Sequence, residues 1–406
     1  MNRVRRIPFP TPARTLQFQL YKVTVQGPHV ENENAPDHRE TLLSQLGTIP
    51  KDTPRLRIEE DTPSDTEWGI LGDHFTSVRD LELYTGWNEE LHDRKMPLHW
   101  PIERLNIGDA CGEVVKSPHI LQGRIKHLIL DQTSGLRFEG PTSAELWDTH
   151  SKAVERGEEQ PHYIGQDGRK VEFVFLPQLA SEWLSNKYNA AGAGNTQPEP
   201  ENRLADGQES HVRTLEIIEN DALDTFVRMG AALPHIADGL TSLTLRSMMI
   251  TDDFQWAPES VFLQLLSSLG GLQTLNLSVG DVFQEPSSIS GLYKNFPPNI
   301  TSLNFRSLLS LCRSERWNEW VDAFSSETFL PRLERLSFVL DLHYKQGLDG
   351  GMALDNPSDQ DITEARAACE KLYEGARRRG IKVEPLHDEW AGGQMGLRAV
   401  DDRWGK

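Results

Sequence analysis

A short apolar pattern recurs along this chain and constrains its fold more than any other feature. Each copy has an aliphatic residue, two variable positions, a second aliphatic residue, one variable position and a third apolar residue, as in Leu240-Thr-Ser-Leu243-Thr-Leu245. Because side chains alternate between the two faces of a strand, each copy predicts a short, half-buried β-strand. Eight good copies begin at Val78, Ile102, Ile125, Val212, Leu240, Leu272, Ile300 and Leu333, and a weaker one begins at Thr53.

The spacing of the copies predicts a repeat array. Successive copies begin between 23 residues apart (102 to 125) and 33 residues apart (300 to 333), with one interval of 87 residues (125 to 212). A short strand at intervals of about 20–30 residues is typical of leucine-rich repeats. Since 87 is three times 29, the long interval predicts two degenerate units between residues 131 and 211, with Val171-Glu-Phe173-Val-Phe175 as the best strand among them.

The segments between the copies carry helical patterns. Residues 258–271 begin with Pro258, have apolar residues at helical spacing and end at Gly270-Gly271, which are the start and stop signals of an amphipathic helix. A strand–helix unit has an apolar face that it cannot bury alone, so neighbouring units must stack. We therefore expect an α/β fold, an irregular leucine-rich-repeat solenoid with parallel strands on its concave face and helices on its convex face. Similar helical patterns occupy residues 223–232, 317–324 and 363–379.

Tryptophan is used ten times in the chain. Trp256, Trp317 and Trp320 fall in the predicted helices or in the loops before them, so we expect them to fill the space between helices and sheet. The alternative is an exposed interaction hot spot, a role in which tryptophan is enriched.

The patterns divide the chain into five segments. Residues 185–210 are small and polar and predict a disordered insertion, and residues 345–360 predict a second long loop. The remaining segments are an N-terminal strand-like cap (1–50), irregular N-terminal repeats (51–184), a C-terminal repeat half ending in a helix and a strand (211–390), and a tail (391–406).

Charge and hydropathy narrow the possible partners. The chain has 42 Lys and Arg against 61 Asp and Glu, a net charge of 42 − 61 = −19, which disfavours non-specific binding to nucleic acids and anionic membranes. Its apolar runs are too short for a membrane-spanning helix, and Pro8, Pro10 and Pro12 interrupt the N-terminus before a signal-peptide core can form. We therefore expect a cytoplasmic or nuclear protein that binds neither nucleic acid nor membrane.

Motifs for catalysis or cofactor binding are weak. The sequence has no HExxH, GxSxG, P-loop or EF-hand pattern. Its three cysteines, Cys111, Cys312 and Cys369, are too widely spaced for a disulfide scaffold or a CxxC metal site. The acidic runs Glu59-Glu60-Asp61 and Asp252-Asp253 follow predicted strands, where solvated charged loops are ordinary. We expect no enzymatic activity, no cofactor and no metal.

Strands of the type LTSLTLRS, LQTLNLS, ITSLNFRS and LERLSFVLD, with acidic composition and long irregular loops, resemble the divergent leucine-rich-repeat proteins of filamentous fungi. Many of those proteins are F-box or F-box-like. The stretch from Ala376 to Glu384 resembles the way such chains close, with a last helix, a glycine and one final strand. The resemblance covers residues 53–385 and implies the solenoid fold. An F-box segment is not recognisable in the first 30 residues, which are strand-like and broken by proline.

The polar residues of the repeats predict a binding face. Because the aliphatic positions face the core, the residues between them should form columns on the concave face. On a chain of charge −19, Arg246 and Arg306 would be local positive points suited to an acidic peptide. The alternative is that these residues are polar only because water covers them. The candidate partner-binding residues are Glu216, Thr244, Arg246, Asn276, Asn304, Arg306 and Arg335.

Two functions follow from these expectations. The first is a non-catalytic interaction scaffold that binds a protein or acidic peptide on the concave face. The second, implied only by the family resemblance, is a substrate-recruiting subunit of a ubiquitin ligase, whose adaptor would be a further partner.

Overall fold

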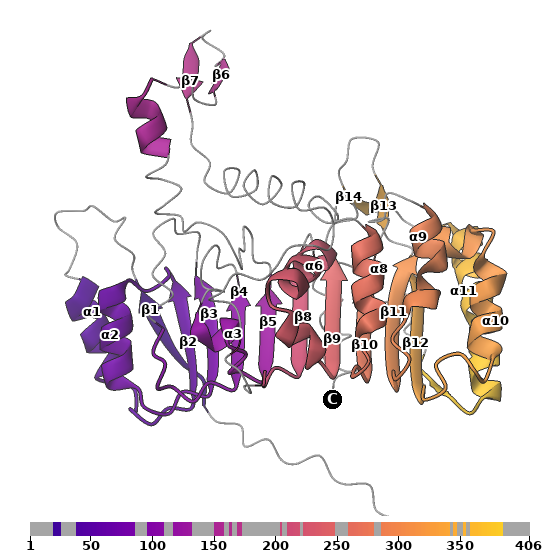
Figure 1. Cartoon of the computed structure of the whole chain (residues 1–406), viewed down its shortest axis with the longest axis horizontal. Coiled ribbons are helices and arrows are strands. Elements are labelled where there is room, and N and C mark those ends of the chain that lie inside the picture. The colour runs from indigo at the N-terminus through magenta and orange to yellow at the C-terminus, as the bar shows by residue number, and fades with distance from the viewer. Residues whose placement is uncertain are drawn as a thin grey trace, which may run out of the picture.

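Eleven strands form one sheet in the computed structural model of the chain, and their arrows point in the same direction (Figure 1). The order is β1-β2-β3-β4-β5-β8-β9-β10-β11-β12-β15, and each neighbouring pair is parallel. The structure describes residues 19–25, 38–85, 96–108, 117–131, 150–157, 162–164, 169–172, 204, 209–219, 222–247, 259–279, 286–341, 344–346, 352–354 and 358–384.

The predicted strands, their parallel pairing and their order are confirmed. Strands β2 to β5 and β8 to β12 each begin two residues after the first residue of their copy, because that residue belongs to the turn entering the strand. The strands are β1 (Tyr21–Val25), β2 (Arg55–Glu60), β3 (Asp80–Thr85), β4 (Arg104–Gly108), β5 (His127–Asp131), β8 (Thr214–Glu219), β9 (Ser242–Ser247), β10 (Thr274–Ser278), β11 (Ser302–Leu308), β12 (Arg335–Asp341) and β15 (Lys382–Val383).

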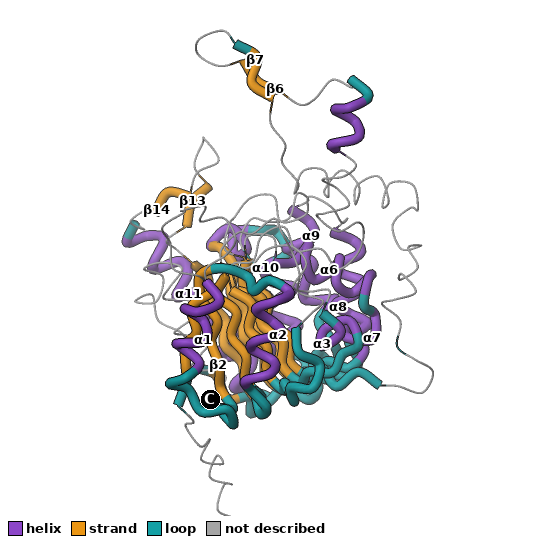
Figure 2. The backbone as a smooth tube through the Cα atoms, turned by 90° about the vertical axis from the view of Figure 1, so that its left-hand side faces the viewer, coloured by secondary structure: helices purple, strands orange, loops and turns teal. Residues whose placement is uncertain are grey.

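Helices connect the strands and pack on the aliphatic face of the sheet. Viewed along the array from its N-terminal end, α1 and α2 are nearest, and α3, α7 and α8 lie on one side of the strands (Figure 2). The helices are α1 (His38–Leu46), α2 (Asp65–His74), α3 (Pro118–Leu121), α6 (Ala222–Ala232), α7 (Pro234–Asp238), α8 (Glu259–Ser268), α9 (Pro286–Gly291), α10 (Trp317–Ser325) and α11 (Asp359–Arg378), with 3-10 turns η4 (Leu292–Asn295) and η5 (Leu309–Arg313).

The aliphatic positions of the repeats form the core. Leu240, Leu243 and Leu245 are at most 1% exposed, and the matching leucines of the other copies are buried in the same way. One hydrophobic cluster runs from Val23 to Ile381, so each unit covers the apolar face of its neighbour. The coarse prediction of an α/β array of stacked strand–helix units is confirmed.

Backbone hydrogen bonds join each unit to the next just before the strands begin. The Arg213 carbonyl accepts from the N–H groups of Thr241 and Ser242, at 2.9 and 3.0 Å. The Thr241 carbonyl accepts in the same way from Gln273 and Thr274. The same two-donor arrangement occurs at the carbonyls of Pro54, Arg79, Glu103, Lys126, Gln273 and Thr301. This carbonyl ladder aligns the strand starts.

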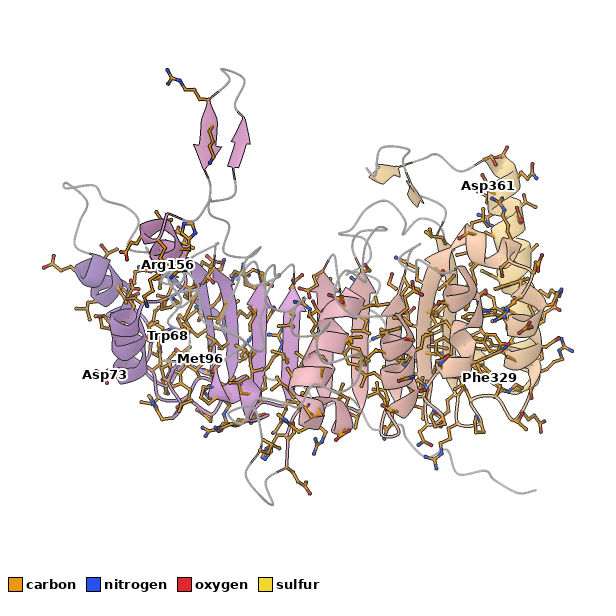
Figure 3. The ribbon with its side chains drawn as sticks, turned by 45° about the horizontal axis from the view of Figure 1, so that its top comes forward. Trp68, Asp73, Met96, Arg156, Phe329 and Asp361 are labelled. Carbon is orange, nitrogen blue, oxygen red and sulfur yellow. The ribbon has the colours of Figure 1, made fainter. Side chains whose placement is uncertain are left out.

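Aromatic side chains fill the layer between helices and sheet at the C-terminal end. Trp320 is fully buried, donates from its indole N–H to the Ser290 carbonyl at 2.8 Å, and has its ring centroid 5.2 Å from that of Phe305. Trp317 is buried too, which confirms the core prediction for both; Trp256 lies outside the described residues. Trp68 is buried at the N-terminal end of the array, far from Phe329 at the C-terminal end (Figure 3).

The array closes as the family resemblance implies. Helix α11 ends at Arg378, and Gly380 follows its C-cap with a positive φ of 81°, which favours glycine. Ile381 N–H donates to the Ala376 carbonyl and Gly380 N–H to the Arg377 carbonyl, which is a Schellman cap. Strand β15 then pairs with β12. Arg379 donates to the carbonyls of Phe324, Phe329 and Leu330, so it fastens this end to the preceding loop.

Two expectations about the irregular segments are wrong. Strand β5 pairs directly with β8, so the two degenerate units expected between residues 131 and 211 do not separate them. Strands β6 (His162–Ile164) and β7 (Lys170–Glu172) instead form their own antiparallel sheet. In the expected second loop, β13 (Tyr344–Gln346) pairs antiparallel with β14 (Met352–Leu354). The predicted disordered insertion (185–210) lies almost wholly outside the described residues, and the tail (391–406) wholly outside them.

The segment expected to be a cap contributes a full strand–helix unit. Strand β1 is the edge of the sheet, and α1 follows it. Thr24 N–H donates to Gln45 Oε1 of α1, and Gln45 Nε2 donates to the Thr24 carbonyl, both at 2.9 Å. A side-chain amide therefore occupies an edge position where another strand would pair.

Among the described helices, none is long and apolar enough to cross a bilayer.

Leu243→Ala and Leu275→Ala should each lower the free energy of unfolding by about 2–5 kcal/mol, because both leucines are fully buried and their loss leaves a cavity. Urea unfolding followed by circular dichroism measures the effect. Leu43→Ala, at a position 48% exposed on α1, is the matched control and should change stability by less than about 0.5 kcal/mol. Equal effects of all three variants would contradict the assignment of the core.

Gln45→Ala should promote self-association, because it uncovers the N–H and carbonyl of Thr24 at the sheet edge. Sedimentation velocity over a range of concentrations measures it. Gln264→Ala, at an exposed position of α8, removes the same amide away from the edge and should leave the sedimentation coefficient unchanged. A Gln45→Ala protein that sediments like wild type at all concentrations would show that the amide does not protect the edge.

Candidate interaction face

We call the sheet surface formed by the side chains between the aliphatic positions the polar face. In its C-terminal half, the strand registers align these side chains in the predicted columns. The three columns are Thr214, Ser242, Thr274, Ser302 and Arg335; Glu216, Thr244, Asn276, Asn304 and Ser337; and Ile218, Arg246, Ser278, Arg306 and Val339.

The middle column carries mostly small polar side chains, two of which are hydrogen-bonded to each other. Asn276 Nδ2 donates to Thr244 Oγ1 at 3.0 Å. Thr244 and Asn304 are 5% and 6% exposed, whereas Arg335 in the first column has 40% of its side chain exposed and lies 3.6 Å from Glu384. The predicted site residues therefore share one face, but its accessible part lies toward the strand starts.

Arg246 and Arg306 are not the exposed positive points that the sequence predicted. They are 2% and 7% exposed, and each has an interaction partner within the chain. The alternation of residues correctly assigns both arginines to the polar face. It carries no information about how deeply each position of that face is buried.

Glu216 joins the two halves of the array. Its Oε1 lies 2.6 Å from Nε2 of His127 on the neighbouring strand β5. Burial raises the pKa of Glu216, but the hydrogen bond from His127 and the positive charges of His127, Arg104 and Arg246 lower it further, so the net pKa is below that of an ordinary glutamate. The carboxylate therefore stays ionised in a partly buried place.

The N-terminal half of the polar face is a network of ion pairs. Asp80 lies 3.0 Å from Arg55 and 2.7 Å from Arg104, on the strands to either side. Glu82, two residues after Asp80 on β3, lies 3.3 Å from Arg104. Glu59 is 2.7 Å from Arg57, so the first residue of the acidic run lies within β2 and belongs to this network, whereas the sequence placed the run in a loop after the strand.

Tyr84 lies across the strands near their carboxyl ends. The Arg57 guanidinium stacks 3.9 Å from its ring centroid, Asn106 Nδ2 donates to its hydroxyl at 3.0 Å, and the hydroxyl donates to Asp131 at 3.5 Å. Gly108 makes room for the ring, since a Cβ there would lie 2.6 Å from Tyr84 Cε1. These residues connect strands β2 to β5.

A further ion-pair row lies at the strand starts. Glu103 accepts from Arg79 and from Lys126, both at 3.1 Å. The hydrogen bond from Lys126 is the main reason that the pKa of Glu103 lies below its ordinary value, and the charges of Lys126 and Arg79 lower it too. Sequence reasoning missed the N-terminal network, although the same alternation, continued from Val78 to Leu130, would have found its columns.

The geometry offers a surface for recognition. In the described part of the chain, no group of three or more His, Cys, Asp or Glu side chains is arranged to hold a metal ion. No family model matches the chain, and no curated protein matches its sequence. The resemblance to F-box and leucine-rich-repeat proteins therefore remains a prediction.

Glu216→Gln should lower stability at neutral pH by about 1 kcal/mol, since it weakens a charge-assisted hydrogen bond that water partly screens. Because folding lowers the pKa of Glu216, its contribution is present above the pKa of an unfolded glutamate, about 4.3, and is lost as the pH falls further. Urea unfolding at several pH values should show the two proteins converging below about pH 4.

Glu334→Gln, at an exposed position before β12, is the control and should change stability little at any pH. A wild-type to Glu216→Gln difference that persists unchanged to low pH would contradict a role for the ionised carboxylate.

Proposed function

We propose that this chain is a non-catalytic interaction scaffold of the leucine-rich-repeat type, which binds a protein or peptide on its polar face. The observation that carries the proposal is the continuity of that face across eleven parallel strands in chain order. Repeat arrays use such extended surfaces for binding, because each unit adds its side chains in register with those of its neighbours.

Three features favour the leucine-rich-repeat type. Each unit has aliphatic residues at fixed positions, as at Leu272, Leu275 and Leu277, all of them buried. The carbonyl ladder repeats at each of these units. The last helix, Gly380 and β15 close the array as in the family that the sequence resembles.

The chemistry of the polar face favours a polar partner segment. Its C-terminal half has half-buried hydroxyl side chains at Ser242, Thr274 and Ser302, which donate and accept hydrogen bonds. Its N-terminal half has half-buried arginines at Arg55 and Arg104. An extended or acidic peptide lying across the strands would meet both kinds of group.

Ser242→Tyr with Ser302→Tyr should abolish partner capture, because two bulky side chains would stand in the half-buried first column of the polar face. The measurement is affinity capture from native cells with quantitative mass spectrometry. The matched control is Ser267→Tyr with Ala367→Tyr, which adds the same bulk at exposed positions of α8 and α11.

A set of captured proteins lost from the polar-face variant and kept by the control supports the proposal. Equal capture by both folded variants contradicts it. Recovery of a ubiquitin-ligase adaptor among the lost proteins would favour the substrate-recruiting function instead of a simple scaffold.

A further inference from the structure

At the strand starts of β3 to β5, carboxylates are shared between cations. Glu103 lies 3.1 Å from Arg79 on one side and 3.1 Å from Lys126 on the other. These three residues belong to successive units, and the carbonyl ladder holds their backbones together, since Glu103 N–H donates to the Arg79 carbonyl and Lys126 N–H to the Glu103 carbonyl. The single negative charge of Glu103 is therefore shared between two positive charges.

A second set, also of two cations and one carboxylate, lies one residue further along the chain in each unit. Asp80 is 3.0 Å from Arg55 and 2.7 Å from Arg104, and the registers place these three residues directly beside one another on β2, β3 and β4. We call the two sets together the amino-end cluster: Arg55, Arg79, Asp80, Glu103, Arg104 and Lys126.

Within each set, the two cations are more exposed than the carboxylate that they share. The side chains of Arg79 and Lys126 are 62% and 60% exposed, against 43% for Glu103. Those of Arg55 and Arg104 are 32% and 30% exposed, against 21% for Asp80. With four cations and two carboxylates, the cluster presents a net positive surface on a chain of charge −19.

The neighbouring charges leave this excess in place. Glu82 lies near Arg55 and Arg104, at 4.0 and 3.3 Å, but only 11% of its side chain is exposed and Arg57 also faces it. In the sequence just before β2 and β5, the exposed charged residues outside the cluster are Lys51, Asp52 and Arg124. The excess acid elsewhere on the chain is screened within about 8–10 Å at physiological salt.

We propose that the amino-end cluster is a docking surface for an acidic peptide segment of a partner protein. The inference rests on the proposed function and deepens it, since it names the partner chemistry and the part of the polar face that meets it. Peptide carboxylates would pair with the exposed cations of the cluster, above all Arg79 and Lys126, and arginine is well suited to this because its planar fork pairs with a carboxylate through two hydrogen bonds.

This placement replaces the one that the sequence suggested. Arg246 and Arg306 are at most 7% exposed, so an incoming peptide would have to uncover them first. The four cations of the amino-end cluster are already at the surface, on the side of the sheet where the strands begin, which is the lower edge in Figure 1.

The test uses the full chain and a fluorescein-labelled oligoglutamate peptide, with binding followed by fluorescence anisotropy and an uncharged Gly-Ser peptide for comparison. Wild type should bind oligoglutamate but not the Gly-Ser peptide. Its affinity for oligoglutamate should fall as the salt concentration rises from about 50 to about 200 mM. Arg79→Glu with Lys126→Glu should weaken binding tenfold or more. Lys371→Glu with Arg378→Glu, at exposed positions of α11, makes the same change in net charge, −19 − 4 = −23, and should leave binding within about twofold, since screening limits its reach.

Glu103→Gln separates recognition from structural support. It removes the carboxylate shared by Arg79 and Lys126, so it should tighten oligoglutamate binding several-fold, whereas a merely structural role predicts no gain. Circular dichroism and thermal melts confirm that each variant is folded. Oligoglutamate binding that is absent, that both double variants weaken equally, or that Glu103→Gln does not tighten would overturn the inference.

A second copy of this acidic chain is the competing occupant. Salt-sensitive self-association lost in Arg79→Glu with Lys126→Glu, together with no oligoglutamate binding, would also overturn the inference. Failure of the inference leaves the proposed function testable, because the tyrosine variants report on native partners and change residues outside the amino-end cluster.

Discussion

The structure depends on one backbone interaction that recurs along the array. From β2 to β11, a carbonyl just before the strand accepts N–H groups from two successive residues of the next unit, as the Arg213 carbonyl does from Thr241 and Ser242. This arrangement fixes where each strand begins, so the strand registers follow without slippage. The variable lengths between units then become loops and helices of different size, which the array tolerates because surface loop length costs little free energy.

Fixed register converts the alternation of residues into two continuous surfaces. Leu243, Leu275 and Leu303 lie side by side on one face and are fully buried. Between them, Thr244, Asn276 and Asn304 lie side by side on the other face. A one-residue slip would exchange the two surfaces, so the carbonyl ladder that holds the strand starts also specifies the polar face.

The features that could be predicted from the sequence depend on residues close together in the chain. The features that could not be predicted depend on residues far apart in the chain. The strands, their order and the columns follow from local patterns, and the burial of Trp320 follows from helical spacing. The direct pairing of β5 with β8 across the 87-residue interval did not follow, because spacing counts units only where the pattern is present. The burial of Arg246 and Arg306 did not follow either, because alternation assigns a residue to a face and not to a depth. The Arg57–Tyr84 stacking depends on Gly108, two strands away from Arg57.

The N-terminal ion pairs have an energetic consequence for function. Half-exposed ion pairs contribute only about 0–1 kcal/mol each to stability. Uncharged polar residues in place of Arg55, Asp80 and Arg104 would therefore give nearly the same free energy of unfolding. The C-terminal half of the same face illustrates this, since Thr214, Ser242 and Thr274 occupy the equivalent positions without charge. Charged residues at these places therefore make their larger contribution to the surface potential, which governs partner choice and association rate more than it governs the fold. The two halves of one continuous polar face therefore differ in surface potential more than in their contribution to the stability of the fold.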